Sequence, residues 1–309
     1  MDTKIVKLSF EAPVHFGKGR LSDASYVCDA GTIFSALYIE ALKMGCADSL
    51  LTAATSGNLT ISDAFPYIGK TLYLPKPMVS FVESGTQQQN HDSREKKAHK
   101  KLAYIPAVKY QDFFTGSLDA LQEIDTFNRG IGSHSLMTKV NLTYEHKKEA
   151  DPYHVGSFVF ANNAGIYFII RGSYDLAPLL ESLQYSGIGG ERSSGYGRFK
   201  YGFIDDDPIV AVSEQICDGQ KFVLLSSAAP RNDELDDELL NEAQYKLVRR
   251  GGFIQSSSHH LLQQKKRDFY VFAAGSIFGC KFSGDVFDVN NTEGAHSVYR
   301  YARALWLAV

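Results

Sequence analysis

A glycine-rich segment in the middle of the chain has the composition of an anion-binding loop. It spans Gly187–Gly197 and contains five glycines in eleven residues. Glycines tolerate positive φ and let a backbone approach a ligand closely, while exposed N–H groups form concavities that suit phosphate oxygens. We therefore predict a phosphate-bearing ligand here, bound by the glycines and the polar residues among them: Gly187, Gly189, Gly190, Arg192, Ser193, Ser194, Tyr196 and Arg198.

The elements expected around this loop exclude two common phosphate motifs. A helix precedes the loop and the strand Tyr196–Phe203 follows it, whereas the dinucleotide fingerprint needs a strand before and a helix after. The loop also lacks the Gly-Lys-Ser/Thr triplet of a P-loop. A flexible helix–strand connection is the alternative interpretation, but two arginines and two serines favour an anion site.

A second group of candidate residues lies in the loop after the first expected strand, where His15 is followed by Phe16, Gly17, Lys18 and Arg20. A histidine here could be the general base of a metal-independent RNA cleavage through the 2′-OH. It could also stack on or hydrogen-bond to a base or ribose, or pack in the core. No partner acid or base stands at a fixed spacing, so we predict RNA contact and assign no catalytic residue.

Two basic clusters occur in the C-terminal third. Arg249, Arg250, Gly252 and Phe253 combine charge, a permissive backbone and an aromatic ring, a set typical of proteins that bind single-stranded nucleic acid. Lys265–Arg267 is the other cluster. We predict RNA binding for the first four residues, although either cluster could instead be the rim of a protein–protein interface.

The polar stretch between residues 83 and 154 contains a further basic run. Arg94–Lys101 has five Lys or Arg side chains in eight residues. It is either a solvated surface or, together with Phe127–Lys139, a hairpin or loop that follows an RNA strand. We include Lys139 among the RNA-binding residues. Neither the cysteines nor the carboxylates stand at metal-ligand spacing, so no metal site is predicted.

Several of these motifs carry a family resemblance. The pattern G-x-G-G-x-R-S-S-G-x-G-R-F at Gly187–Phe199 resembles the glycine-rich loop of the repeat-associated (RAMP) CRISPR proteins. Other segments resemble one family among them, the fourth Csm subunits of type III-A CRISPR systems: Phe10–Gly19, Ile33–Leu37, Asp63–Pro66, Leu74–Pro77, Ser182–Gly187 and Phe272–Ser276. Together they span nearly the whole chain.

The resemblance implies partners as well as a fold. It implies a subunit that caps the 5′ end of the crRNA and holds the repeat-derived tag. It further implies contacts with the large polymerase-like Csm subunit and with the first backbone RAMP subunit, and an indirect relation to the target RNA. The bound crRNA would then be the only ligand, with no other cofactor and no membrane.

Three functions compete on the sequence alone. We expect a non-catalytic crRNA-binding subunit of a type III-A Csm interference complex in antiviral defence. The alternative is a metal-independent crRNA-processing endoribonuclease that uses His15. A scaffold with little RNA contact is a third reading, but basic clusters in three separate segments argue against it.

The elements that must position these residues indicate an α+β chain with two ferredoxin-like (RRM-like) domains. The first covers residues 1–204, with an insertion at about 83–154, and the second covers residues 209–309. Asp205–Pro208 is the expected linker, because three like charges and a proline disfavour helix and strand. The clearest expected elements are strands at Ile5–Phe10 and Ile166–Ile170 and helices at Thr32–Met44, Asp175–Tyr185 and Glu234–Asn241, the first capped by Asp29 and ended by Gly45.

The composition of the chain says more about the cellular compartment of the protein than about the ligand that it binds. The chain has 309 residues, 44% of them hydrophobic, and a net charge of −3. RNA binding must therefore rest on local basic patches. The four cysteines form no C-x-x-C pair, and neither a secretory signal nor a membrane-length apolar run is visible. We expect a cytoplasmic protein.

Overall fold

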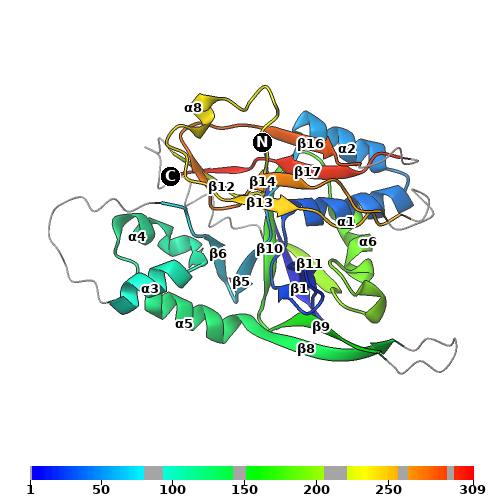
Figure 1. The fold of residues 1–309 in the computed structure, drawn as a ribbon, viewed down its shortest axis with the longest axis horizontal. Helices are drawn as coiled ribbons and strands as arrows, with labels where there is room; N and C mark the ends of the chain where they lie inside the picture. The colour runs from blue at the N-terminus through cyan, green and yellow to red at the C-terminus, as the bar shows by residue number, and fades with distance from the viewer. Residues whose placement is uncertain (1, 80–92, 142–150, 205–220, 257–263, 291–295) are drawn as a thin grey trace.

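The computed structural model describes residues 2–79, 93–141, 151–204, 221–256, 264–290 and 296–309. It is a mixed α/β fold (Figure 1), whose elements in chain order are β1 (Thr3–Phe10), β2 (Phe16–Gly17), β3 (Ala24–Ser25), α1 (Ala30–Lys43), α2 (Ala47–Ser56), β4 (Leu59–Ile61), β5 (Phe65–Ile68), β6 (Thr71–Pro75), α3 (Ser93–Lys101), β7 (Tyr104–Pro106), η1 (Ala107–Lys109), α4 (Tyr110–Thr115), α5 (Ala120–Ile131), β8 (Gly132–Asn141), β9 (Asp151–Phe160), β10 (Ala164–Gly172), α6 (Ala177–Ser186), η2 (Arg192–Ser194), β11 (Phe199–Ile204), β12 (Phe222–Leu224), α8 (Asp237–Leu240), β13 (Leu247–Arg250), β14 (Phe269–Phe272), β15 (Ile277–Phe278), β16 (Gly284–Asp288), β17 (Tyr299–Arg303) and β18 (Trp306–Ala308).

The largest sheet has the strand order β11-β1-β10-β5-β6-β7, with β4 also paired to β10. β1 is antiparallel to both of its neighbours, and Val6 lies opposite Phe168 and Phe203. Successive side chains of a strand point to opposite faces. Each face of the sheet therefore contributes to its own hydrophobic core. Val6 and Phe168, on one face, pack with α1 and α6 in the first core, and Ile5, on the other face, packs with α4 and the C-terminal strands in the second core.

Local sequence signals explain the helices on the first face. Asp29 caps α1, because its Oδ1 accepts a hydrogen bond from Thr32 N at 2.6 Å. The helix ends at Lys43, just before Gly45, whose φ is +71°. Pro178 stands in the first turn of α6, where its missing N–H costs nothing. The expected helices at Thr32–Met44 and Asp175–Tyr185 are thus confirmed to within a few residues.

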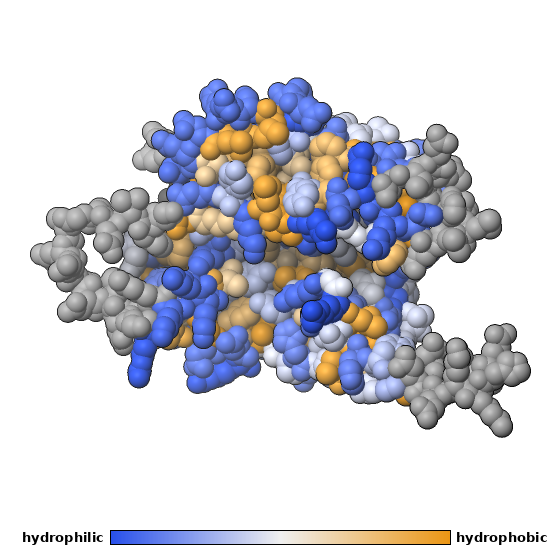
Figure 2. Space-filling model, in the orientation of Figure 1, coloured by the Kyte–Doolittle hydropathy of each residue, from blue (hydrophilic) through white to orange (hydrophobic). Residues whose placement is uncertain are grey.

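The polar stretch that the sequence sets apart as an insertion contributes to the central sheet and its core. β7 pairs with β6, and Leu102, Ile105 and Tyr110 are buried in the second core. The basic run is helix α3, with Ala98 facing the core and its described lysines exposed. Figure 2 shows hydrophilic side chains over α3 and α5. The sequence allowed either a solvated surface or a hairpin or loop along RNA for this run. A helix with exposed lysines fits the first expectation and not the second.

The longest hairpin of the described chain is β8–β9, which extends from the lower edge of the molecule in Figure 1. β9 is tied back to the segment after β1, since Val14 and Phe158 exchange two backbone hydrogen bonds of 2.9 Å. The hairpin is therefore anchored at its base by the candidate histidine loop.

The C-terminal part forms smaller sheets, β15-β12-β18, β13-β14 and β16-β17. The α-helix that the structure describes in this part is α8, which is shorter than the expected helix at Glu234–Asn241. Val223, Leu225 and Leu307 lie in the same core as Ile5. The expected linker Asp205–Pro208 lies outside the described residues.

A buried carboxylate fastens the C-terminal part to the start of α1. Asp63 Oδ1 accepts hydrogen bonds from Ala30 N at 2.8 Å and Ser227 N at 2.7 Å, and Oδ2 accepts one from the Ser227 hydroxyl at 2.7 Å. Burial, followed by repulsion from Asp29, raises the pKa of Asp63 to about 6. One side chain thus joins three segments that are distant in the sequence.

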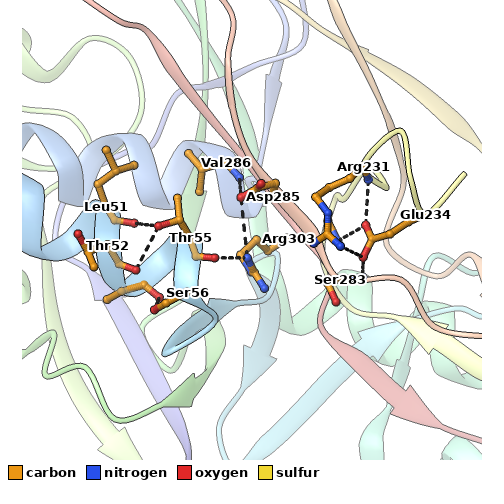
Figure 3. A network of polar contacts seen from close by, with 12 residues as sticks. Leu51, Thr52, Thr55, Ser56, Arg231, Glu234, Ser283, Asp285, Val286 and Arg303 are labelled. Carbon is orange, nitrogen blue, oxygen red and sulfur yellow. Dashed lines mark hydrogen bonds and ion pairs between the residues drawn. The ribbon is translucent and has the colours of Figure 1, made fainter.

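Arginines make a second set of ties. Arg303 donates to Thr55 O at 2.8 Å, which attaches β17 to the C-terminal end of α2 (Figure 3). Nearby, Glu234 accepts from Ser283 N at 2.8 Å and pairs with Arg231 at 3.2 Å (Figure 3). Of the helices that the structure describes, none is long and apolar enough to cross a membrane.

The raised pKa of Asp63 predicts a pH dependence of stability. Because the folded pKa of about 6 exceeds the ordinary 3.8, the folded state binds this proton more tightly, and its stability should rise as pH falls. Between about pH 7 and pH 5, wild type should gain roughly 1 kcal/mol relative to Asp63→Asn in urea denaturation. Wild type should show no such gain relative to the control variant Asp112→Asn, which changes an exposed position of α4 and keeps Asp63. A constant difference between wild type and Asp63→Asn would contradict this.

Candidate nucleic-acid interface

The two ends of the glycine-rich loop are closed on each other and on the chain after β1. Ile188 N donates to Gly197 O at 3.0 Å, and Gly197 N donates to Pro13 O at 2.9 Å. Gly197 has φ +74°, and a Cβ there would stand 2.1 Å from Ile188 O. A side chain cannot fit, so this glycine is required by loop closure.

The middle of the loop packs against His15. Gly190 N donates to His15 O at 2.8 Å. A Cβ on Gly189 would stand 2.7 Å from His15 O, and one on Gly190 would stand 2.7 Å from the imidazole Cδ2. The sequence predicted that these glycines let a ligand approach the backbone. In the structure the close approach is made by the protein's own histidine segment.

The histidine itself is buried, with 7% of its surface exposed. Its Nδ1 donates to Gly156 O of β9 at 2.6 Å, which fixes the tautomer with a proton on Nδ1. Phe16 is 5% exposed and meets Phe10 edge to face. Both rings are therefore enclosed by protein, and the structure does not support the expectation that they stack on bases. Gly17 is exposed at the end of β2, and Lys18 and Arg20 are exposed in the turn between β2 and β3.

Lys139 of β8 connects the hairpin to the loop. Its ammonium pairs with the Glu191 carboxylate and donates to the Ser194 hydroxyl at 2.9 Å. The hydrogen bond to Glu191 raises the pKa of Lys139. Tyr196 is buried and donates to Met137 Sδ at 3.7 Å. Lys139 and Tyr196, predicted as RNA ligands, thus hold β8 on the loop.

Sequence reasoning missed two residues on which this arrangement depends. Glu191 has a left-handed backbone, with φ 57°, and supplies the partner of Lys139. A Cβ on Gly156 would stand 2.1 Å from Ser22 O, so only glycine fits beside the β2–β3 turn. Glu191 stands at a variable position of the loop pattern and Gly156 in no motif, because the role of each is defined by a partner far away in the sequence.

The cations left for a ligand lie around this packed unit. Arg198 is exposed and Arg192 is half-buried, and neither forms an ion pair with another described residue. Ser193 is exposed between them. Because the loop is bonded to Pro13 and His15, its arginines belong to the same unit as Lys18 and Arg20. Guanidinium groups with free donors suit phosphate oxygens, and phosphate contacts carry no base information.

The C-terminal candidates are engaged elsewhere. Arg249 pairs with Asp268 at 3.3 Å, and Arg250 Nε lies 3.0 Å from Asp29 Oδ2. Gly252 is exposed with φ +122°, and Phe253 is 51% exposed, with Lys265 Nζ 5.7 Å from its ring centroid. No described hydrogen bond or ion pair joins this group to the glycine-rich loop. We therefore treat the C-terminal residues as a group separate from the glycine-rich loop.

No group of three or more His, Cys, Asp or Glu side chains able to hold a metal ion occurs in the part of the chain that the structure describes.

Comparison with known sequences decides the family. Residues 217–309 match the CRISPR Csm4 C-terminal domain. The chain is 36% identical over 311 residues to a CRISPR system Cms protein Csm4 of Mycobacterium tuberculosis, covering 100% of this chain and 98% of the relative. It is 33% identical to the Csm4 protein of Streptococcus thermophilus, covering 99% of this chain and 98% of that one. The chain belongs to the Csm4 family.

Solved structures share the fold of this Csm4 family member at lower identity. A Csm3-Csm4 subcomplex of a type III-A CRISPR-Cas interference complex contains a chain with a TM-score of 0.64 and 19% identity, covering 99% of both chains. A Csm1-Csm4 cassette in complex with cA4 contains one with a TM-score of 0.62 and 19% identity, covering 100% of this chain and 98% of that one. The mixed α/β fold is thus confirmed as that of Csm4 structures.

The closure of the glycine-rich loop predicts different losses of stability for the same substitution at two of its glycines. Gly197→Ala should destabilise the protein by several kcal/mol, because the new Cβ overlaps Ile188 O and φ stays positive. Gly195 also has a positive φ, +86°, but nothing lies within 4 Å of its Cβ, so Gly195→Ala should cost only about 1 kcal/mol. Urea denaturation of the two variants measures the difference. Equal losses would show that loop closure does not require Gly197.

Proposed function

We propose that this chain is a crRNA-binding subunit of a type III-A Csm interference complex and anchors the repeat-derived 5′ tag. The observation that carries the proposal is that backbone hydrogen bonds fix the loop Gly187–Gly197 to Pro13 and His15. Arg192 within the loop and Arg198 directly after it have no protein ion-pair partners in the described chain. A backbone that is already held in place loses little conformational entropy when its side chains bind a phosphate.

The proposed protein partners are the large subunit and the backbone subunit. Solved relatives are described as a Csm3-Csm4 subcomplex and as Csm1-Csm4 cassettes. A chain of the same family and fold is proposed to bridge the same two kinds of subunit. The target RNA would then be reached through the guide and not by this chain directly.

We propose a structural role for His15 rather than an endoribonuclease role. Its Nδ1 proton is committed to Gly156 O, and its ring is covered by Gly190. A general base needs access to the 2′-OH proton that it abstracts. The burial of His15 supports a function in holding β9 and the glycine-rich loop together, so RNA should be recovered at full length after incubation with the protein.

The N-terminal part is proposed to be a ferredoxin-like domain. The succession β1, α1, β5, β10, α6, β11 and the antiparallel order β11-β1-β10-β5 support this classification. For residues 209–309 the proposal of a second such domain rests on the family resemblance alone. Residues from both parts pack in the same hydrophobic core. A boundary near residue 204 therefore separates two segments of the sequence but does not separate two independent cores.

Salt dependence of RNA binding tests the proposed function. Each phosphate neutralised on a single strand contributes about −0.7 to the slope of log K against log salt. Arg192→Gln and Arg198→Gln should each flatten the slope by about 0.7, equally for different guide sequences. Fluorescence anisotropy with a repeat-tag RNA measures it.

The matched control is Arg129→Gln. Arg129 is an exposed arginine of α5 that pairs with Asp125 at 2.6 Å, and its removal should leave the slope unchanged. If neither loop arginine alters the slope, the phosphates are bound elsewhere on the protein.

A further inference from the structure

Two basic clusters that the sequence shows separately meet at the start of α1. Arg250 Nε lies 3.0 Å from Asp29 Oδ2. Arg300, from β17, donates to Gly251 O at 3.1 Å and is attracted by the same Asp29. Lys266 N donates to Gly252 O at 2.9 Å, and its ammonium is repelled by Arg300 and attracted by Asp29. Three cations from three segments thus interact with one carboxylate.

The charges in this cluster do not balance. Asp29 interacts with Arg250, Lys266 and Arg300, and Asp63 interacts with Arg250. The neighbouring Asp268 is paired with Arg249, so three cations and two carboxylates leave one positive charge in excess when both carboxylates are ionised. Asp63 is occupied by its three hydrogen bonds to Ala30 and Ser227. Within the described chain, no ion pair or side-chain hydrogen bond engages Lys266. Burial, followed by repulsion from Arg300, lowers the pKa of Lys266 to about 8, while Asp29 acts in the opposite direction.

The cluster combines a fixed wall with an open side. Arg300 is 7% exposed, and its Nε is buried without a hydrogen-bond partner among the described residues. Arg250 keeps 31% of its side chain exposed, Lys266 is half-buried, and Gly251 and Gly252 are exposed beside them. An anion could therefore reach the cations from solvent past Gly252, where nothing lies within 4 Å of an added Cβ, whereas the Asp268 carboxylate stands against Gly251.

We propose that Arg250, Lys266 and Arg300 form a phosphate-binding site, distinct from the glycine-rich loop. A phosphodiester carries one negative charge, which matches the excess, and its non-bridging oxygens accept hydrogen bonds from guanidinium and ammonium donors. The phosphate can come from an RNA strand, in which case the site rests on the proposed function as a second point of contact, or from a free nucleotide.

Protection of Lys266 from acetylation tests the site in the full-length protein. Acetic anhydride labels free amines, and mass spectrometry reports Lys266 and its exposed neighbour Lys265 separately. RNA or ATP is added at equal phosphate concentration. Bound phosphate should slow labelling of Lys266 several-fold and that of Lys265 much less. Protection by RNA alone assigns an RNA phosphate, and protection by ATP assigns a nucleotide. Protection of neither lysine, or of both equally, overturns the proposal.

A pair of variants adds a binding measurement. Lys266→Met and Lys265→Met each remove one charge from adjacent positions, so their long-range electrostatic effects are nearly equal. Lys266→Met should weaken binding of the protecting ligand roughly tenfold and Lys265→Met about twofold or less. Equal losses would contradict a seated phosphate. Should Lys266→Met fail to fold, the protection of the wild-type protein still decides.

The same titrations separate this proposal from the proposed function. If RNA binds, as shown by anisotropy, while Lys266 remains unprotected by RNA and by ATP, the site is wrong and the RNA-binding function stands. If RNA does not bind at all, the proposed function fails, and the ATP experiment still tests the site.

Discussion

The close approach of the glycine-rich loop to the backbone around His15 is the constraint on which the rest of the interface depends. Gly190 and Gly197 each donate a backbone hydrogen bond into Pro13–His15, and neither has room for a side chain. His15 in turn holds β9 through Gly156 O. Loop, histidine segment and hairpin therefore form one packed unit, and its exposed arginines are positioned by backbone contacts instead of by their own side chains.

The second constraint lies at the junction with the C-terminal part. Asp63 and Asp29 are adjacent buried carboxylates that bind the start of α1 to Ser227 and Arg250. A buried charge of this kind is tolerated when hydrogen bonds and a counter-charge compensate it. The junction brings cations from β13, β17 and the segment around Lys266 to one place. The chain thus has two cationic surfaces, one at the glycine-rich loop and one at this junction.

Much of the fold could be predicted because its signals are local. A few neighbouring residues are enough to recognise each of these signals: the N-cap Asp29 of α1, the glycine Gly45 after its end, and the apolar strand before Gly172. The helix α3 was missed because its five Lys or Arg residues suggest a solvated or RNA-binding run, while the burial of Ala98 depends on the neighbouring core. The site was harder still. His15 leaves no room for side chains at positions 189 and 190, and Asp29 forms an ion pair with Arg250. Both contacts join residues that are distant in the sequence, so they appear only in the folded structure.

The central claim is that the unit formed by the glycine-rich loop and the histidine segment faces the crRNA. Photocrosslinking in the assembled complex tests it most directly, with a crRNA that carries a photoreactive nucleotide in its 5′ tag and mass spectrometry of the attached peptides. Crosslinks should concentrate in the peptides that contain Lys18–Arg20 and Arg192–Arg198. Crosslinks confined to other peptides, with none in these two, would contradict the account.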